Sequence, residues 1–143
     1  MAELIVTQDV EAPTEQVWAA LVDWELHGEW MLFTHATGGA AVGEPIEAFT
    51  GIGRFGFLDR MTITVWQPPH RAVVRHTGRV VRGSGAFEVR DLQPGRSQIV
   101  WSEWIDLPLG IVGRAGWPLV RPLVRAGVSF SLRRLARYVE AAR

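Results

Sequence analysis

The last third of the chain, Leu109–Arg143, is the only stretch long enough to form one dominant helix, and it limits what the rest can fold into. Everything before it divides into short segments. An α-helix turns by about 100° per residue, and at that spacing one face collects apolar side chains: Val124, Val128, Leu132, Leu135, Ala136 and Val139. Because a sheet must bury its apolar face against another element, we expect strands to close on this face.

Segments ahead of the helix are predicted to be β-strands from their alternating hydrophobicity and from the turn residues that end them. They are Glu3–Glu11, Glu44–Thr50, Asp59–Gln67, Arg71–Gly78, Gly83–Leu92 and Ser97–Leu107. Pro68-Pro69 and Gln93–Gly95 are short turns, so these strands are expected to pair as consecutive antiparallel neighbours.

Two short helices are expected between the first two strands. Pro13 ends the first strand, and Thr14 is a suitable N-cap for a helix that ends near Asp23. Trp24–Met31 is predicted to be a second short helix or a turn.

Composition excludes several classes of protein. Hydrophobic residues make up 48% and charged residues 21%, as in a folded protein, and the length predicts one domain spanning 1–143. The 15 basic and 15 acidic residues cancel, which argues against nucleic acid or an anionic membrane as partner. Arginines interrupt the apolar stretch 111–128, so no stable membrane insertion is expected. We expect a soluble cytoplasmic protein.

No cofactor and no metal are predicted. The chain has no cysteine, and His27 and His35, which flank Glu29, match no usual spacing of metal ligands. The segment Gly51–Gly56 (GIGRFG) precedes a strand rather than a helix, so it lacks the phosphate-binding geometry of a dinucleotide fold. We interpret it as a mobile lid over the pocket, and Thr37–Gly43 as a surface loop.

Two groups of residues resemble a known superfamily. The first is Val10–Trp18 (VEAPTEQVW) followed by Asp23 and Trp30, and the second runs from Pro68-Pro69 through Arg75–Gly78 (RHTG) to Gly83–Val89 (GSGAFEV). Together they resemble the START-like, or SRPBCC, superfamily, and within it actinobacterial members of the polyketide cyclase/dehydrase-like families. The resemblance covers essentially the whole chain.

This resemblance implies an α+β helix-grip fold. In such a fold a curved, six- to seven-stranded antiparallel sheet wraps a long C-terminal helix and leaves a cavity for an apolar ligand. The superfamily includes carriers, cyclases, hydrolases and chaperone regulators, so the resemblance specifies fold better than function.

The turns also predict which strand residues face the helix. The turn at Gln93–Gly95 places Phe87 opposite Trp101, and opposed residues share a face. Extending this register through turns near Val80-Val81 and Pro68–His70 gives an inner face of Met61, Ile63, Val65, Ala72, Val74, His76, Phe87, Val89, Ile99, Trp101, Glu103 and Ile105. The polar members are His76 and Glu103. The register puts Gly85 between them, so they can meet directly or through one ligand atom or water.

Arg121 and Arg125 lie upstream on the packing face of the helix, unless Pro122 changes its phase. One interpretation brings them to the cavity mouth, where arginine suits a carboxylate, phosphate or enolate. In the other, each pairs with a surface acid such as Glu29 or Asp106.

The opposite face of the helix carries Leu119, Leu123 and Phe130. These residues are expected either to pack under the short helices or to form an exposed patch used for dimerisation.

The leading hypothesis is the binding or transport of a hydrophobic small molecule, such as a lipid, polyketide or isoprenoid, without catalysis. The predicted ligand-binding residues are Met61, Ile63, Val74, His76, Phe87, Trp101, Glu103, Arg121, Arg125, Val128 and Leu132. One alternative is a cyclase/aromatase or dehydratase that uses His76 and Glu103 as acid and base and Arg125 to steady an enolate. Another is a protein-interaction module or homodimer.

Overall fold

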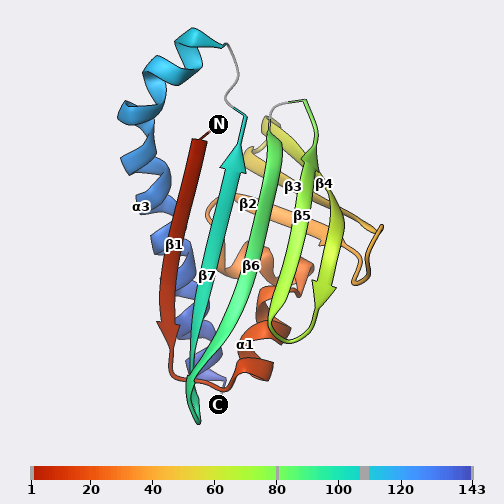
Figure 1. The fold of residues 1–143 in the computed structure, drawn as a ribbon, viewed down its shortest axis with the longest axis vertical. Coiled ribbons are helices and arrows are strands. Elements are labelled where there is room, and N and C mark those ends of the chain that lie inside the picture. The colour runs from red at the N-terminus through yellow and green to blue at the C-terminus, as the bar shows by residue number, and fades with distance from the viewer. Residues whose placement is uncertain (1, 80, 107–109, 143) are drawn as a thin grey trace.

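The computed structural model describes residues 2–79, 81–106 and 110–142. A seven-stranded antiparallel sheet, in the order β1-β7-β6-β5-β4-β3-β2, curves around short helices and a long C-terminal helix (Figure 1). The strands are β1 (Ala2–Val10), β2 (Thr34–Gly38), β3 (Pro45–Ile52), β4 (Phe55–Gln67), β5 (Arg71–Thr77), β6 (Arg82–Gln93) and β7 (Arg96–Ile105). The helices are α1 (Thr14–Leu21), η1 (Trp24–Leu26, a 3-10 turn), α2 (His27–Trp30) and α3 (Ile111–Ala141). The predicted α+β helix-grip architecture is confirmed.

The seventh strand, β2, was not expected. It pairs with β3 from Thr34 opposite Thr50 to Gly38 opposite Ile46, so the predicted surface loop at Thr37–Gly43 is wrong in its first two residues. The β2 sequence, THATG, has little apolar alternation. It is an edge strand, and its pairing with β3 defines it more than its composition does.

The predicted lid at Gly51–Gly56 is also wrong. Gly51 pairs with Gly56 inside the β3–β4 hairpin, and only Gly53 and Arg54 lie between the two strands. A Cβ atom on Gly51 would lie 2.3 Å from the carbonyl oxygen of Phe55. These glycines therefore permit two strands to approach closely at a tight turn.

The register between β6 and β7 is as predicted, with Phe87 opposite Trp101 and Gly85 opposite Glu103. Between β5 and β6 it differs by two residues, because Thr77 already pairs with Arg82 and the turn is centred earlier than expected. Val74, not His76, is therefore opposite Gly85. A shift of two residues keeps every side chain on its predicted face.

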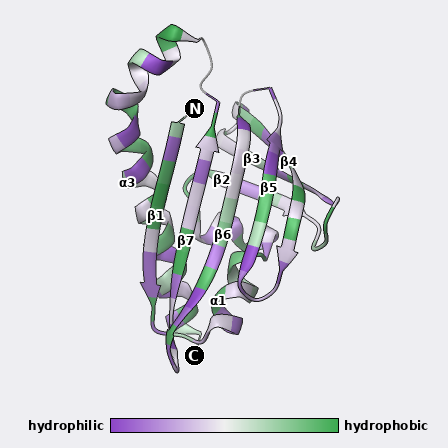
Figure 2. Ribbon diagram, viewed as in Figure 1, coloured by the Kyte–Doolittle hydropathy of each residue, from purple (hydrophilic) through white to green (hydrophobic). Residues whose placement is uncertain are grey.

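A β-bulge between Ile63 and Val65 changes the predicted inner face of β4. Val65 pairs with Val73, on the outer face, while Trp66 pairs with Ala72 and packs against the core. Along the strands hydrophobic and hydrophilic residues alternate (Figure 2). The terminal residues Leu107, Leu109 and Arg143 of the predicted last strand and helix, and Val80 of the predicted turn, lie outside the described residues.

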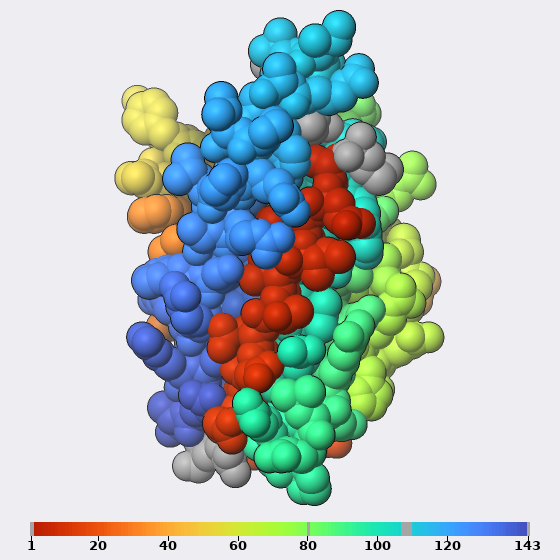
Figure 3. Space-filling model, turned by 60° about the vertical axis from the view of Figure 1, so that its left-hand side comes forward, coloured from red at the N-terminus to blue at the C-terminus, as the bar shows by residue number. Residues whose placement is uncertain are grey.

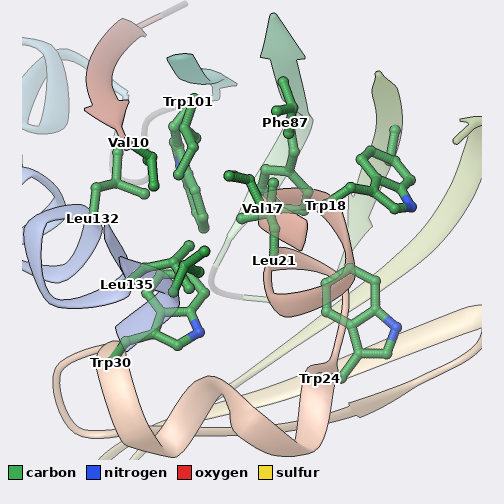
Figure 4. Packing of buried hydrophobic residues seen from close by; sticks show 14 of the residues in the cluster. Val10, Val17, Trp18, Leu21, Trp24, Trp30, Phe87, Trp101, Leu132 and Leu135 are labelled. Carbon is green, nitrogen blue, oxygen red and sulfur yellow. The ribbon is translucent and has the colours of Figure 1, made fainter. Parts of the chain in front are cut away.

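The core lies between the sheet and the helices, where Val10, Val17, Leu21 and Leu135 pack with several tryptophans (Figure 4). All the buried residues of α3 lie in its C-terminal part: Ser131, Leu132, Leu135, Ala136 and Val139. The first turns of α3 extend beyond the ends of β1 and β7 (Figure 1). One helix thus has a packed half and an exposed half.

Candidate functional site

Three polar side chains meet on the inner face of the sheet. The imidazole of His76 (β5) lies between two carboxylates, with Nδ1 2.8 Å from Oδ1 of Asp59 (β4) and Nε2 2.8 Å from Oε2 of Glu103 (β7). His76 and Glu103 are buried, and the side chain of Asp59 is 16% exposed. The structure thus brings the two predicted polar residues into direct contact and adds a third.

Gly85 makes room for this contact. It is the residue of β6 opposite both Val74 and Glu103, and a Cβ atom there would lie 2.8 Å from Oε2 of Glu103. That distance is shorter than a normal van der Waals contact, so the Glu103 carboxylate occupies the space that a side chain at position 85 would fill. The absence of a side chain therefore allows the carboxylate to reach His76 diagonally across the sheet.

The surroundings change the protonation of both residues. Burial alone would lower the pKa of His76, but the hydrogen bonds and negative charges of Asp59 and Glu103 outweigh it and raise the pKa to about 10. Burial raises the pKa of Glu103, while the hydrogen bond and charge of His76 oppose that rise. A proton is therefore held firmly between His76 and Glu103.

The three side chains of the cluster belong to the lining of a small, partly open cavity of about 60 Å³, which we call the inner chamber. This volume suffices for a few water molecules. Its lining comes from η1, from α2 and the residue that follows it, and from six strands: Trp24, His27, Met31, Thr34, Ala36, Ile46, Ala48, Thr50, Asp59, Met61, His76, Phe87, Trp101 and Glu103. Five of the predicted ligand-binding residues belong to this set: Met61, His76, Phe87, Trp101 and Glu103.

A larger hollow of about 370 Å³, the entrance groove, adjoins the chamber and shares Met31, Thr34, Thr50 and Trp101 with it. It lies between α3 and the start of β2, and it is lined by Trp30, Met31, Leu32, Phe33, Thr34, Thr50, Phe57, Trp101, Val124, Gly127, Val128, Ser131 and Leu132. The lining is mostly apolar, and the buried indole N–H of Trp30 has no hydrogen-bond partner in the described part of the chain.

The remaining predicted ligand-binding residues lie in several places. Val128 and Leu132 line the entrance groove. Ile63 and Val74 are each 1% exposed and belong to the core, but neither is among the residues that line the two cavities.

Arg121 and Arg125 lie outside both cavities. They line a groove between α3 and β1, with Glu3 and Trp117, on the face where the helix and strand run side by side (Figure 3). The guanidinium of Arg125 donates a hydrogen bond of 3.0 Å to the carbonyl oxygen of Ile5. Because β1 is an edge strand, it offers unpaired backbone groups to this flank of the helix.

The outward side chains of α3 stay exposed: Leu119 is 80%, Leu123 73% and Phe130 42% exposed. They do not pack under the short helices, which excludes the first of the two expectations for these residues. Within the described residues, no helix is long and apolar enough to cross a membrane.

The model of the family described as "Polyketide cyclase / dehydrase and lipid transport" matches residues 1–140. The chain belongs to this family. A search of curated proteins found no match. Solved structures share its fold. TTHA0849 from Thermus thermophilus is 18% identical with a TM-score of 0.78, and each chain covers 99% of the other.

Two further structures show the same likeness. A conserved protein from Geobacillus kaustophilus is 13% identical with a TM-score of 0.77, over 99% of this chain and 97% of that one. DynU16, a protein in the dynemicin biosynthetic locus, is 19% identical with a TM-score of 0.73, and the match covers 99% of this chain but 48% of DynU16. At such identities the likeness concerns the fold alone.

Some residues of the site were not predicted from the sequence. Asp59 carried a usable signal, because it stands two residues before Met61 on the same strand and so shares its inner face. Thr34 and Ala36 could not be found, because the strand that carries them was not predicted. The sequence suggests His27 only as a metal ligand of unsuitable spacing; in the structure its buried ring lies between those of Trp24 and Trp30, with ring centroids 5.1 and 4.7 Å away.

Proposed function

We propose that this family member binds a hydrophobic small molecule, such as a lipid, polyketide or isoprenoid, with its body in the entrance groove and one end in the inner chamber. The observation that carries the proposal is an apolar groove of about 370 Å³ that adjoins a chamber lined in part by a buried polar cluster. Small-molecule sites typically combine an apolar hollow of this size with a few converging polar groups. The family description, which includes lipid transport, supports the same function.

The geometry gives less support to the alternative in which His76 acts as a general base. A base must have a free lone pair within reach of the proton it abstracts. Both ring nitrogens of His76 are already hydrogen-bonded to carboxylates. The pair is better suited to holding a ligand than to taking a proton from it.

Filling the entrance groove tests the proposed function. Val128 is partly buried and lines the groove, so Val128→Trp should occupy the space of the ligand body. We expect this variant to bind the apolar fluorescent probe N-phenyl-1-naphthylamine at least about tenfold more weakly than the unmodified protein, as one tightly packed apolar group is worth more than about 1.5 kcal/mol. Fluorescence titration measures the affinity.

The matched control is Leu119→Trp, which adds the same ring to the exposed face of the same helix. Its affinity for the probe should equal that of the unmodified protein. Unchanged binding by Val128→Trp, in a protein that melts as one cooperative unit, would show that the groove is not the binding site. Native mass spectrometry of the freshly purified protein provides a second measurement, because a carried-over apolar ligand would appear as added mass.

A further inference from the structure

The polar cluster of the inner chamber carries one negative charge however its proton is placed. If His76 is protonated, one cation faces two carboxylates; if Glu103 holds the proton, a neutral imidazole and a carboxylic acid face the Asp59 carboxylate. Both ring nitrogens are engaged in either case, and a hydrogen bond from the side chain of Trp101 also reaches Glu103. The cluster therefore offers lone pairs to a ligand and keeps its own hydrogens.

The aromatic donors of the chamber are engaged as well. The indole N–H of Trp24 donates a 2.8 Å hydrogen bond to the carbonyl of Gly39. Nε2 of His27 is 2.9 Å from the carbonyl of Leu21, so this nitrogen must carry the hydrogen. Burial lowers the pKa of His27, which favours the neutral ring and leaves Nδ1 as an acceptor.

The two threonine hydroxyls of the chamber follow the same pattern. Thr34 donates its hydrogen to the carbonyl of Leu32 at 2.8 Å. In the 3.0 Å contact between the hydroxyls of Thr34 and Thr50, Thr50 must then be the donor. Each hydroxyl retains lone pairs and has used its one hydrogen.

No lysine or arginine compensates for this excess of acceptors in the described lining. The chain contains no lysine, and no arginine belongs to the described residues that line the chamber or the groove. Arg121 and Arg125 lie on the far flank of α3. The unpartnered donor nearby, the indole N–H of Trp30, lines the groove rather than the chamber, and one neutral N–H does not offset the burial of a full charge.

We propose that the chamber receives the hydrogen-bond-donating end of an amphipathic ligand, a hydroxyl or an amine, and rejects a carboxylate. A donor finds carboxylate oxygens already in place, whereas a carboxylate would add a second negative charge beside Asp59 and Glu103 where dielectric screening is weak. The volume of about 60 Å³ admits a head group but no chain, so the apolar body stays in the entrance groove. This inference rests on the proposed binding function and specifies its ligand class.

A matched set of eight-carbon compounds tests it: 1-octanol, octylamine and octanoate share one body and differ in the head. Calorimetric titration at pH 7 into the purified protein should give affinities for the alcohol and the amine at least about tenfold higher than for octanoate. Trp24 and Trp101 line the chamber, so tryptophan fluorescence provides an independent signal of the same binding.

Two variants locate the selectivity. Glu103→Gln keeps the shape of the side chain but removes the charge and adds an amide donor, so the preference for octylamine over octanoate should fall at least about tenfold. Asp59→Asn, at the more exposed edge of the cluster, should also lower the preference for octylamine over octanoate, but by a smaller factor. It serves as the test if Glu103→Gln does not fold.

The outcomes separate this inference from the proposed function. If octanoate binds as tightly as octanol, or if both variants keep the preference of the unmodified protein, the donor-selective chamber is wrong while apolar binding stands. If none of the three compounds binds, the binding function itself is wrong and the inference fails with it.

Discussion

The interior of the protein has two regions that obey different rules. One is the dry core, formed by Val10, Val17, Leu21, Leu135 and Val139, each at most 4% exposed. The other is the chamber cluster of Asp59, His76 and Glu103, which is charged; His76 and Glu103 are buried, and the side chain of Asp59 is 16% exposed. In the dry core, burial itself stabilises the fold. In the cluster, burial costs free energy that hydrogen bonds and opposite charges must offset.

This difference separates stability from function within one protein interior. The C-terminal half of α3 closes the dry core, while its first half leans on β1 and exposes apolar side chains. Substitutions in the dry core should therefore change the free energy of unfolding and leave ligand selectivity intact. Substitutions in the cluster should change how stability and binding depend on protonation.

The largest effect is expected from Leu135→Ala in the dry core. Leu135 is 0% exposed, and truncating a buried leucine typically costs about 2–5 kcal/mol because a cavity remains. Urea unfolding followed by circular dichroism measures the change. The control is Leu123→Ala on the exposed face of the same helix, where the side chain is 73% exposed and the loss should stay within about 0.5 kcal/mol.

Equal losses for Leu135→Ala and Leu123→Ala would contradict the division of α3 into a packed and an exposed half. A large loss for Leu123→Ala would also indicate that its face is covered in solution. In that case sedimentation velocity of the unmodified protein should show a homodimer, which was one of the expectations for this face.

The next effect concerns pH and belongs to the cluster alone. The pKa of His76 is about 10 in the folded protein against an ordinary 6.5, so the folded state holds this proton more tightly than the unfolded chain does. The resulting stability is complete below pH 6.5 and is lost as pH rises through 10. The raised pKa of Glu103 acts in the same direction, because its proton too is held more tightly in the folded state.

One unit of pKa shift corresponds to about 1.4 kcal/mol, so the loss between about pH 6.5 and pH 10 should be on the order of a few kcal/mol. Urea unfolding at several pH values measures it. His76→Gln should flatten the dependence in this window, whereas Leu135→Ala should shift the whole curve downward without changing its slope. A slope that survives in His76→Gln must come from other groups, Glu103 included, and would show that His76 is not its source.

The sequence alone predicts the features that depend on periodicity, such as which strand residues face the interior. Alternation placed Val74, His76 and Glu103 on one face, and an error of two residues in register left that face unchanged. The sequence alone does not predict the position of a segment or side chain that depends on a partner elsewhere in the chain. β2 exists because β3 pairs with it, and Trp66 replaces Val65 inside because of a bulge. Helical phase placed Arg125 on the packing face of α3, but it did not predict that the guanidinium binds a carbonyl of the edge strand β1 instead of lining the cavity.

The smallest predicted effect is also the most local. Gly85→Ala places a Cβ atom 2.8 Å from Oε2 of Glu103, so the carboxylate must rotate away and its hydrogen bond to His76 must break. The free energy of unfolding should fall by about 1–3 kcal/mol, the cost of leaving a buried polar group without its partner. The pKa of His76, followed by NMR, should move toward its ordinary value, since it loses one of its two acceptors.

The control is Gly116→Ala in α3, where an added Cβ meets no atom within 4 Å. There alanine favours the helix and should raise stability by up to about 1 kcal/mol. If the Glu103 carboxylate fills the space over Gly85, the same glycine-to-alanine change should lower the free energy of unfolding at position 85 and raise it at position 116. A Gly85→Ala variant as stable as the parent, with the pKa of His76 unchanged, would mean that the carboxylate lies elsewhere, and the cluster would then reduce to His76 and Asp59.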